Sequence, residues 1–243
     1  MSSSWFDVVR VTLVVIAAAA VMGCSSLSST VPALPPHKPL ASVSVDDLIA
    51  DTQVIHTDPF SLVQAWWIPL EFWQASLGRI NPQLAQEVSA ILGDYSLVAV
   101  VQADVSALGG FVFYSRDDLQ QRLRVQWQVD DAEPVSLDLV TEPNVAVRNL
   151  VQQLSPLLSR TMGDMGRNLQ FFVLNDRAAD GGRLVDPYRR GQVLIGLSAS
   201  ETQPAAQLAL ELPLDALFER RYCANGKPAR VTWRFCPWDG RPL

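Results

Sequence analysis

Ser96-Leu97-Val98-Ala99-Val100-Val101-Gln102-Ala103-Asp104-Val105 is an apolar stretch rich in β-branched side chains. A short continuous apolar run of this composition predicts a strand that is buried on both faces. Residues 106–110 have the composition of a turn, and Phe111–Tyr114 is again apolar and aromatic. The two runs therefore predict a β-hairpin, which we expect to lie at the centre of a sheet.

Further strands are predicted downstream of this hairpin. Residues 123–129 and 135–139 alternate apolar and polar side chains, as half-buried strands do. Apolar segments at 169–174, 193–197 and 206–212 have the composition of three more strands. Since short turns connect consecutive strands, the sheet should be mainly antiparallel, with helices over one face. The predicted fold class is α+β: a mainly antiparallel sheet covered by helices, with a small C-terminal hairpin that contains cysteines.

Helices are predicted from capping residues and from the spacing of apolar side chains. Ser44 and the acids after it begin a short helix, and Asn81-Pro82 begins another. Thr141-Glu142-Pro143 opens the longest one, in which apolar residues from Val147 to Leu158 recur at helical spacing.

Three tryptophans close together allow two interpretations. Asp58-Pro59 resembles a helix start, and the predicted helix carries Trp66, Trp67 and Trp73 in one stripe, with Pro69 expected to kink or shorten it. An aromatic stripe at helical spacing usually packs against a core. The alternative is that the three side chains form a surface for a partner or ligand.

The N-terminal residues have the features of an export signal. An apolar run from Val11 to Met22 follows a weakly charged start, and its roughly twelve residues are too few to cross a hydrocarbon layer about 30 Å thick. Ala20-Val21-Met22-Gly23-Cys24 resembles the lipobox of bacterial lipoproteins. An ordinary signal peptide and a signal anchor are the alternatives.

The lipobox resemblance implies a membrane address. Lipoproteins of this kind are diacylated on the Cys thiol and usually acylated on its amine, so Cys24 would become the lipidated N-terminus. Ser25 rather than Asp follows Cys24. In Gram-negative bacteria this favours the outer membrane, with the protein facing the periplasm.

The predicted organisation has four parts. Residues 1–23 are a lipoprotein signal peptide, and residues 24–43 are a Ser/Pro-rich tether in which His37 should be solvated. Residues 44–221 form the α+β domain, and residues 222–243 form a tail.

Composition argues against several functional classes. The net charge is −6 and no block of Lys or Arg occurs, so nucleic acid is not expected as a partner. With only His37 and His56, neither a His-based triad nor a multi-His metal site is expected. The sequence also lacks a Gly-x-Ser-x-Gly elbow and a Gly-rich phosphate loop. We therefore predict no cofactor and no enzymatic activity.

A polar segment at 175–191 leaves one catalytic alternative open. Asn175–Gly182, with Asp176 and Asp180, faintly resembles a Ca²⁺ loop, but Pro187 stands where the bidentate acid is required, so a hairpin loop is expected. Asp186 follows in the same segment. If these acids lay near the tryptophans, the protein could be a carrier of a small apolar ligand or a carboxylate-based enzyme.

The tail resembles a zinc ribbon, whose two knuckles read Cys-Pro-x-Cys-Gly. Cys223 and Cys236 match the first Cys of each knuckle, but Gly226 and Asp239 replace the second ligands. Two thiolates and one carboxylate lack a fourth zinc ligand, so no metal is predicted. With Cys24 assigned to lipid, an oxidising compartment permits a Cys223–Cys236 disulfide.

These features together predict an envelope lipoprotein. It would be a non-enzymatic binding or assembly subunit of an envelope complex, attached to the membrane by lipid on Cys24 and in contact with an envelope protein partner.

Overall fold

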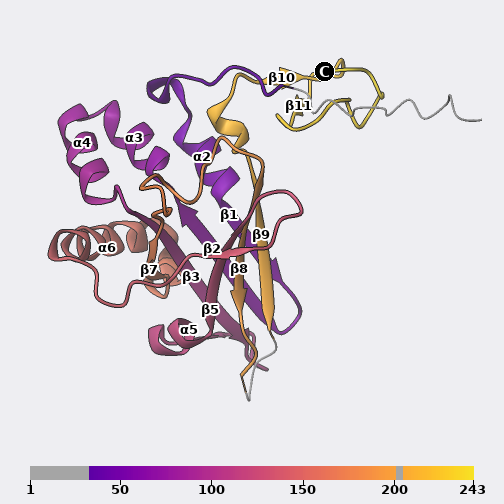
Figure 1. Cartoon of the computed structure of the whole chain (residues 1–243). Coiled ribbons are helices and arrows are strands. Elements are labelled where there is room, and N and C mark those ends of the chain that lie inside the picture. Colours follow the sequence, from indigo (N-terminus) through magenta and orange to yellow (C-terminus); the bar gives the residue numbers. More distant parts are fainter. Residues whose placement is uncertain (1–32, 201–204) are drawn as a thin grey trace, which may run out of the picture. The chain divides into compact units, whose positions relative to one another are not determined.

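The computed structural model describes residues 33–200 and 205–243, with the side chains of residues 154, 155 and 157–164 left out (Figure 1). Leu34–Leu243 form one compact unit, and the buried hydrophobic core belongs to it. A unit with its own core meets the requirement for independent folding.

Two antiparallel sheets make up the β part of the main fold, and a third, two-stranded sheet lies near the C-terminus. The first has the order β1-β2-β3-β4, with β7 also paired to β3. Its strands are β1 (Gln53–Thr57), β2 (Ser61–Ile68), β3 (Tyr95–Val105), β4 (Phe111–Phe113) and β7 (Gln170–Asn175). β3 pairs with β2 on one side, and with β7 and then β4 on the other. The central position predicted for Ser96–Val105 is confirmed.

The second sheet has the order β6-β5-β8-β9. Its strands are β5 (Leu123–Gln128), β6 (Val135–Ser136), β8 (Gly191–Leu197) and β9 (Ala206–Leu212). Buried residues alternate with more exposed ones along β5, β8 and β9, so one face of this sheet is turned to the core.

Two helices begin after the predicted capping residues Ser44 and Asn81, whereas the longest begins at Val145, two residues after the predicted start at Pro143. The helices are η1 (Leu40–Ser42), α2 (Val45–Thr52), α3 (Leu70–Gly78), α4 (Pro82–Ile91), α5 (Arg116–Arg122), α6 (Val145–Arg167) and η2 (Asp215–Leu217). The side chains of Ser44 and Asn81 accept backbone N–H groups in the first turns of α2 and α4, and Ser115 forms a capping box on α5.

The two faces of the first sheet are covered differently. Trp66 of β2 lies opposite Ala99 of β3, and its ring contacts Phe72 of α3, so helices cover this face. Gln102 is three residues further along β3 and therefore lies on the other face. Its side chain accepts a 3.0 Å hydrogen bond from Arg122, directly before β5, so the second sheet covers that face. The α+β class is confirmed, with the strands of the main fold divided between two sheets.

One predicted helix is a strand. Residues after Asp58-Pro59 form β2, and the helix α3 begins only after Pro69. The Asp58 carboxylate does accept the backbone N–H groups of Phe60 and Ser61, but it closes a turn between β1 and β2. Asp58-Pro59 therefore marks a chain reversal between two strands, and its interpretation as a helix start is wrong.

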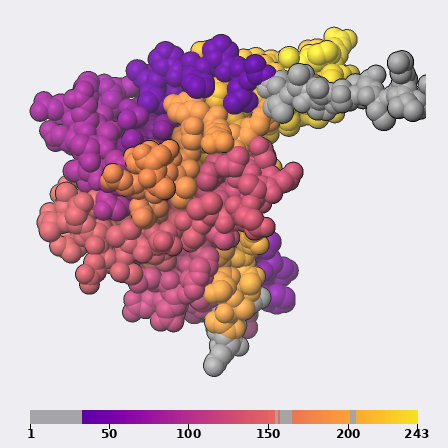
Figure 2. All heavy atoms as spheres, viewed as in Figure 1, coloured from indigo at the N-terminus to yellow at the C-terminus, as the bar shows by residue number. Residues whose placement is uncertain are grey.

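The end of the predicted tether packs against the domain. The Pro36 carbonyl accepts the N–H of Glu219, and the Lys38 N–H donates to the Leu217 carbonyl, both within 2.9 Å. Val43 is fully buried. Figure 2 shows these first described residues, in indigo, beside the yellow C-terminal residues. The boundary expected at residue 43 therefore differs from the structure, in which the folded part already includes residues 36–43.

Candidate functional site

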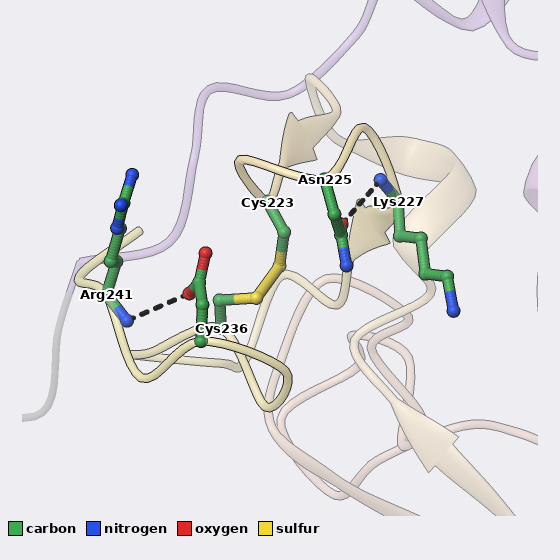
Figure 3. Close-up of a disulfide and its surroundings, with 6 residues drawn as sticks. Cys223, Asn225, Lys227, Cys236 and Arg241 are labelled. Carbon is green, nitrogen blue, oxygen red and sulfur yellow. Dashed lines mark hydrogen bonds between the residues drawn. A yellow bond between two sulfur atoms is a disulfide. The ribbon is translucent and has the colours of Figure 1, made fainter.

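The tail is a small disulfide-bonded unit attached to the main fold; in the structure we define it as residues 220–243, because β10 begins at Arg221 rather than at the predicted boundary of residue 222. It contains the hairpin of β10 (Arg221–Tyr222) and β11 (Pro228–Ala229). Cys223 and Cys236 form a disulfide with their Cα atoms 5.7 Å apart, which confirms the predicted pair (Figure 3). Both cysteines are buried in a cluster of their own, separate from the main core.

Two loops of the tail have the same design. Asn225-Gly226-Lys227-Pro228 and Asp239-Gly240-Arg241-Pro242 repeat one pattern: a side-chain acceptor, a glycine, a cation and a proline. Sequence reasoning missed this repeat. A comparison of the tail with itself would have revealed it.

The repeated residues also form the same bonds. Asn225 Oδ1 accepts the Lys227 N–H and Asp239 Oδ1 accepts the Arg241 N–H, each at 3.0 Å. Gly226 and Gly240 have φ values of 77° and 69°, a region that other residues rarely adopt. Each loop is therefore fixed in a turn that ends in a cation.

The cysteines close both loops at their base. The Cys223 N–H donates to the Lys227 carbonyl at 2.9 Å, and the Cys236 N–H donates to the Arg241 carbonyl at 2.8 Å. Figure 3 shows Lys227 and Arg241 on either side of the disulfide. The resemblance of this tail to a zinc ribbon stays a prediction.

Arg221 joins the hairpin to the rest of the tail. Its guanidinium Nη2 donates to the carbonyls of Arg230, Val231 and Trp233 at 2.8 to 3.2 Å. A single cation that satisfies three buried or half-buried carbonyls fixes the path of the chain between the two loops.

Aromatic side chains are exposed around the loops. The Trp238 side chain is 49% exposed; its ring lies 5.7 Å from that of Trp233, and Lys227 Nζ lies 4.8 Å from its centroid. Tyr222 and Phe235 are exposed as well. The tail thus presents apolar rings and cations together.

The charge of the tail is opposite to that of the rest of the chain. Residues 220–243 carry six Lys and Arg side chains against one acid, Asp239, a charge of +5. Because the whole chain carries −6, the other residues carry −11. The six cations are Arg220, Arg221, Lys227, Arg230, Arg234 and Arg241.

An acidic pocket lies at the base of the tail. A cavity of about 260 Å³ is lined by residues of α2, η2 and the tail, among them Asp47, Asp51, Asp215, Arg220 and Arg230. Arg220 pairs with Asp47, and Arg230 pairs with Asp215. The cations at the base of the tail are therefore neutralised by acids of the domain.

Asp51 is the residue of this pocket whose pKa is shifted far from its ordinary value. Its burial raises the pKa of the carboxyl to about 6, although the backbone N–H of Ala216 donates to it and favours the charged form. A carboxyl that titrates near neutrality can exchange protons at physiological pH.

Trp66, Trp67 and Trp73 belong to the core. They are 2%, 0% and 4% exposed, so the alternative of a partner or ligand surface is wrong. Residues 63–68 of β2 are buried on both faces of the strand, because helices cover one face and the second sheet covers the other. The indole N–H of Trp66 donates to Thr52 Oγ1 inside the core.

The three acids of residues 175–191 serve the loop itself. Asp176 is fully buried, pairs with Arg183 and accepts the Val185 N–H. Asp180 accepts the N–H of Gly182, and Asp186 accepts that of Tyr188. Each of the three acids therefore holds a local turn of this segment, and the carboxylate-based alternative stays a prediction.

Glu71 of α3 joins the buried ion pair from the other side. Its carboxylate lies 3.7 Å from Arg183, and burial raises the pKa of this carboxyl. The pKa of Tyr188 is raised to about 12, first by burial of its hydroxyl and second by the negative charge of Glu71. The network packs the loop against α3.

A second cavity, of about 350 Å³, lies between α6 and β7. Its lining is mixed, with the polar side chains of Arg116, Arg148 and Gln152 beside the apolar Val151 and Phe171. Arg116 donates to the Phe171 carbonyl near the start of β7, while residues 138–140 bond to Val173 and Asn175 further along the same strand.

An apolar tip ends the first sheet; we define it as Phe60, Leu108, Phe111 and Val112. Leu108 and Phe60 are 99% and 77% exposed, and the other two are half or more exposed. The Val105 N–H donates to the Phe60 carbonyl, and Val105 pairs with Phe111, so the turn that carries Phe60 lies beside the β3-β4 hairpin that carries the other three side chains.

Other sequence-derived sites have simple outcomes. Cys24 and the lipobox lie outside the described residues. His37 is exposed, and its ring lies 4.6 Å from that of Tyr188. Among residues 33–200 and 205–243, His, Cys, Asp and Glu side chains do not gather in threes that could hold a metal ion. In the same part of the chain, the helices are too short or too polar to cross a membrane.

Comparisons with protein-family models, curated proteins and solved structures found no match for the chain.

Proposed function

We propose that this protein is an exported lipoprotein that acts as a non-enzymatic binding or assembly subunit of an envelope complex. The observation that carries the binding role is the apolar tip. Four large apolar side chains, on the β1-β2 turn and the adjacent β3-β4 hairpin, are exposed there, at a cost that folding alone does not explain. An exposed apolar patch of this kind fits a protein partner with a complementary apolar surface.

The address rests on the lipobox and is supported by the tail. A Cys223–Cys236 disulfide fits an oxidising compartment such as the periplasm, whereas disulfides are rare in the cytosol. Lipid on Cys24 would then provide two or three acyl chains, enough for stable anchoring. Ser25 favours the outer membrane.

The arrangement of the domain supports this division of roles. The described chain enters beside Leu217 and Glu219, next to the start of β1, whereas the apolar tip follows the other end of β1. The eight residues of β2 separate the two ends by about 26 Å. Attachment and partner binding would therefore use opposite ends of the first sheet.

Site-specific photocrosslinking tests the binding role. A photoreactive amino acid at Leu108, introduced in the cells that produce the protein, should give one discrete adduct with an envelope protein. The control position is Val145, an exposed apolar residue at the start of α6. Equal adduct patterns at both positions, or none at Leu108, would contradict a docking role for the tip.

The anchor is tested separately by mass spectrometry of the N-terminal peptide. We expect acyl chains on Cys24 and no residues before it. Cys24→Ser should move the protein from the membrane fraction to the soluble fraction. A Cys24 peptide without lipid, or unchanged fractionation of the variant, would refute the anchor whatever the crosslinking shows.

A further inference from the structure

We propose that the tail binds the surface of a membrane rich in anionic phospholipids, as a second contact beside the lipid on Cys24. The inference deepens the proposed function, since it places the folded domain against the membrane that the lipid anchors. The binding itself needs only the tail and is measurable without the anchor.

The first argument is that three positive side chains of the tail have no ion-pair partner among the described residues. Arg220, Arg221 and Arg230 are bonded to acids or carbonyls of the protein. Lys227, Arg234 and Arg241 are exposed, and within residues 33–200 and 205–243 none of them forms an ion pair. These three side chains, which we call the free cations, are available to phosphate groups outside the chain.

The second argument is that the free cations accompany exposed aromatic rings. Lys227 lies over Trp238, Arg234 precedes the exposed Phe235, and Tyr222 is exposed on the hairpin. Tryptophan and tyrosine gather with basic residues at membrane interfaces, since their rings enter the headgroup layer while the cations meet phosphates. A polyanion without an apolar layer would leave these rings in water.

The third argument is position. The first described residues bond to Leu217 and Glu219, immediately before the tail, so the chain from Cys24 arrives at the tail's base. The roughly twelve residues between Cys24 and Pro36 reach at most about 40 Å when fully extended. Lipid on Cys24 would therefore keep the tail within a short distance of the membrane surface.

The fourth argument is preorganisation. Lys227 and Arg241 end two loops that have the same bonds and are joined by the disulfide. The loops therefore lose little conformational freedom when they bind a surface. Asp239 is the acid of the same surface, and its Oδ1 accepts the Arg241 N–H, so one of its carboxylate oxygens is bonded within the loop.

Vesicle binding of residues 25–243 tests the proposal, because the compact unit Leu34–Leu243 contains the core. The probes are vesicles of phosphatidylcholine with or without 30% phosphatidylglycerol, carrying brominated acyl chains. Trp66, Trp67, Trp73 and Trp127 are buried in the core, so bromine quenching reports Trp233 and Trp238. We expect quenching on the anionic vesicles and little on the neutral ones.

Two matched triple variants test the role of the free cations. Lys227→Gln/Arg234→Gln/Arg241→Gln should weaken binding to the anionic vesicles by about 100-fold, since each cation near an anionic surface contributes roughly fivefold. The control, Arg124→Gln/Arg148→Gln/Arg189→Gln, removes the same charge from exposed positions outside the tail and should bind as the parent does.

Trp238→Ala separates a membrane from other polyanions. On anionic vesicles it should bind several-fold more weakly, because it loses the exposed ring. Failure of the parent to bind anionic vesicles, or equal losses in both triple variants, would overturn the proposal. Unchanged vesicle binding by Trp238→Ala together with equal affinity for a single-stranded oligonucleotide would overturn it as well. Acylation of Cys24 is a separate readout, so either proposal can fail while the other holds.

Discussion

Asp51 at the end of α2 accepts a 2.7 Å hydrogen bond from the backbone N–H of Ala216 in η2, across 165 residues of sequence. The bond holds η2, which leads into the tail, against α2, which follows the N-terminal segment. It is made by a carboxyl that burial holds in its protonated form up to about pH 6.

This pKa predicts a pH-dependent stability. The pKa of Asp51 is raised from 3.8 to about 6 in the folded protein, so the folded state binds the proton more tightly than the unfolded chain. Its contribution is complete below about pH 4 and is lost as the pH rises to about 6, a change of roughly 3 kcal/mol. Asp51→Asn should remove this part of the slope in urea denaturation between pH 4 and pH 7.5.

Asp131→Asn, in the exposed turn before β6, is the control for Asp51→Asn. It should leave the slope of the parent unchanged. The assignment fails if Asp51→Asn keeps the full slope, since the titration would then belong to another group.

The hydrogen bond from Trp66 to Thr52 predicts a second stability effect. Thr52 Oγ1 accepts the indole N–H at 3.1 Å and donates to the Leu48 carbonyl. Thr52→Val should leave the indole N–H unpaired in the core and lower the free energy of unfolding by about 1–3 kcal/mol. Chemical denaturation measures this, and the same substitution at the exposed Thr57 of β1 should have a small effect. Equal effects at both positions would show that the indole bond contributes nothing.

The buried ion pair of Asp176 and Arg183 predicts a larger loss of stability than the Trp66–Thr52 bond does. Asp176→Asn would keep the acceptor for the Val185 N–H and remove the charge that compensates Arg183. Removal of one partner of a buried pair costs about 3–5 kcal/mol, and we expect the lower end because Glu71 also faces Arg183. Asp180→Asn, in the same loop, is the control for thermal and urea denaturation. A loss below 1 kcal/mol in Asp176→Asn would contradict the assignment.

Reduction of the disulfide should loosen the tail while the main core persists. Cys223 and Cys236 are 13 residues apart, and a loop of this size is stabilised by roughly 3 kcal/mol in the loop-entropy account. Cys223→Ser/Cys236→Ser should therefore speed hydrogen exchange within residues 221–243 and leave β3 protected, because the tail has its own small cluster. Faster exchange in β3 by a similar factor would show that the tail and core unfold together.

The sheet could be read from the sequence because its strands carry simple patterns. β5, β8 and β9 alternate along one buried face, and β3 is apolar throughout, so period and composition both predict strands. β2 could not be read in this way. A strand buried on both faces has apolar residues at every spacing, including the helical one, and Asp58-Pro59 supplied a false helix start.

The prediction of a helix in place of β2 also explains why the three tryptophans were considered as a ligand surface. On a surface helix, Trp66, Trp67 and Trp73 could have faced a ligand, but two covered faces of a sheet leave no such surface. The disulfide followed from cysteine number and compartment. The repeated loop motif around it could have been found by comparing the tail with itself, but the shared bonds of Asn225 and Asp239 are known only from the structure.

The bonds between residues 36–38 and residues 217–219 have a mechanical consequence. They join the point where the chain enters the fold to the segment in which the main fold ends. A pull on the N-terminal segment would load these two backbone bonds and the buried Val43 before any strand of either sheet. Tension on an anchor would thus be taken up at one corner of the domain, while the apolar tip and its neighbouring strands stay unstrained.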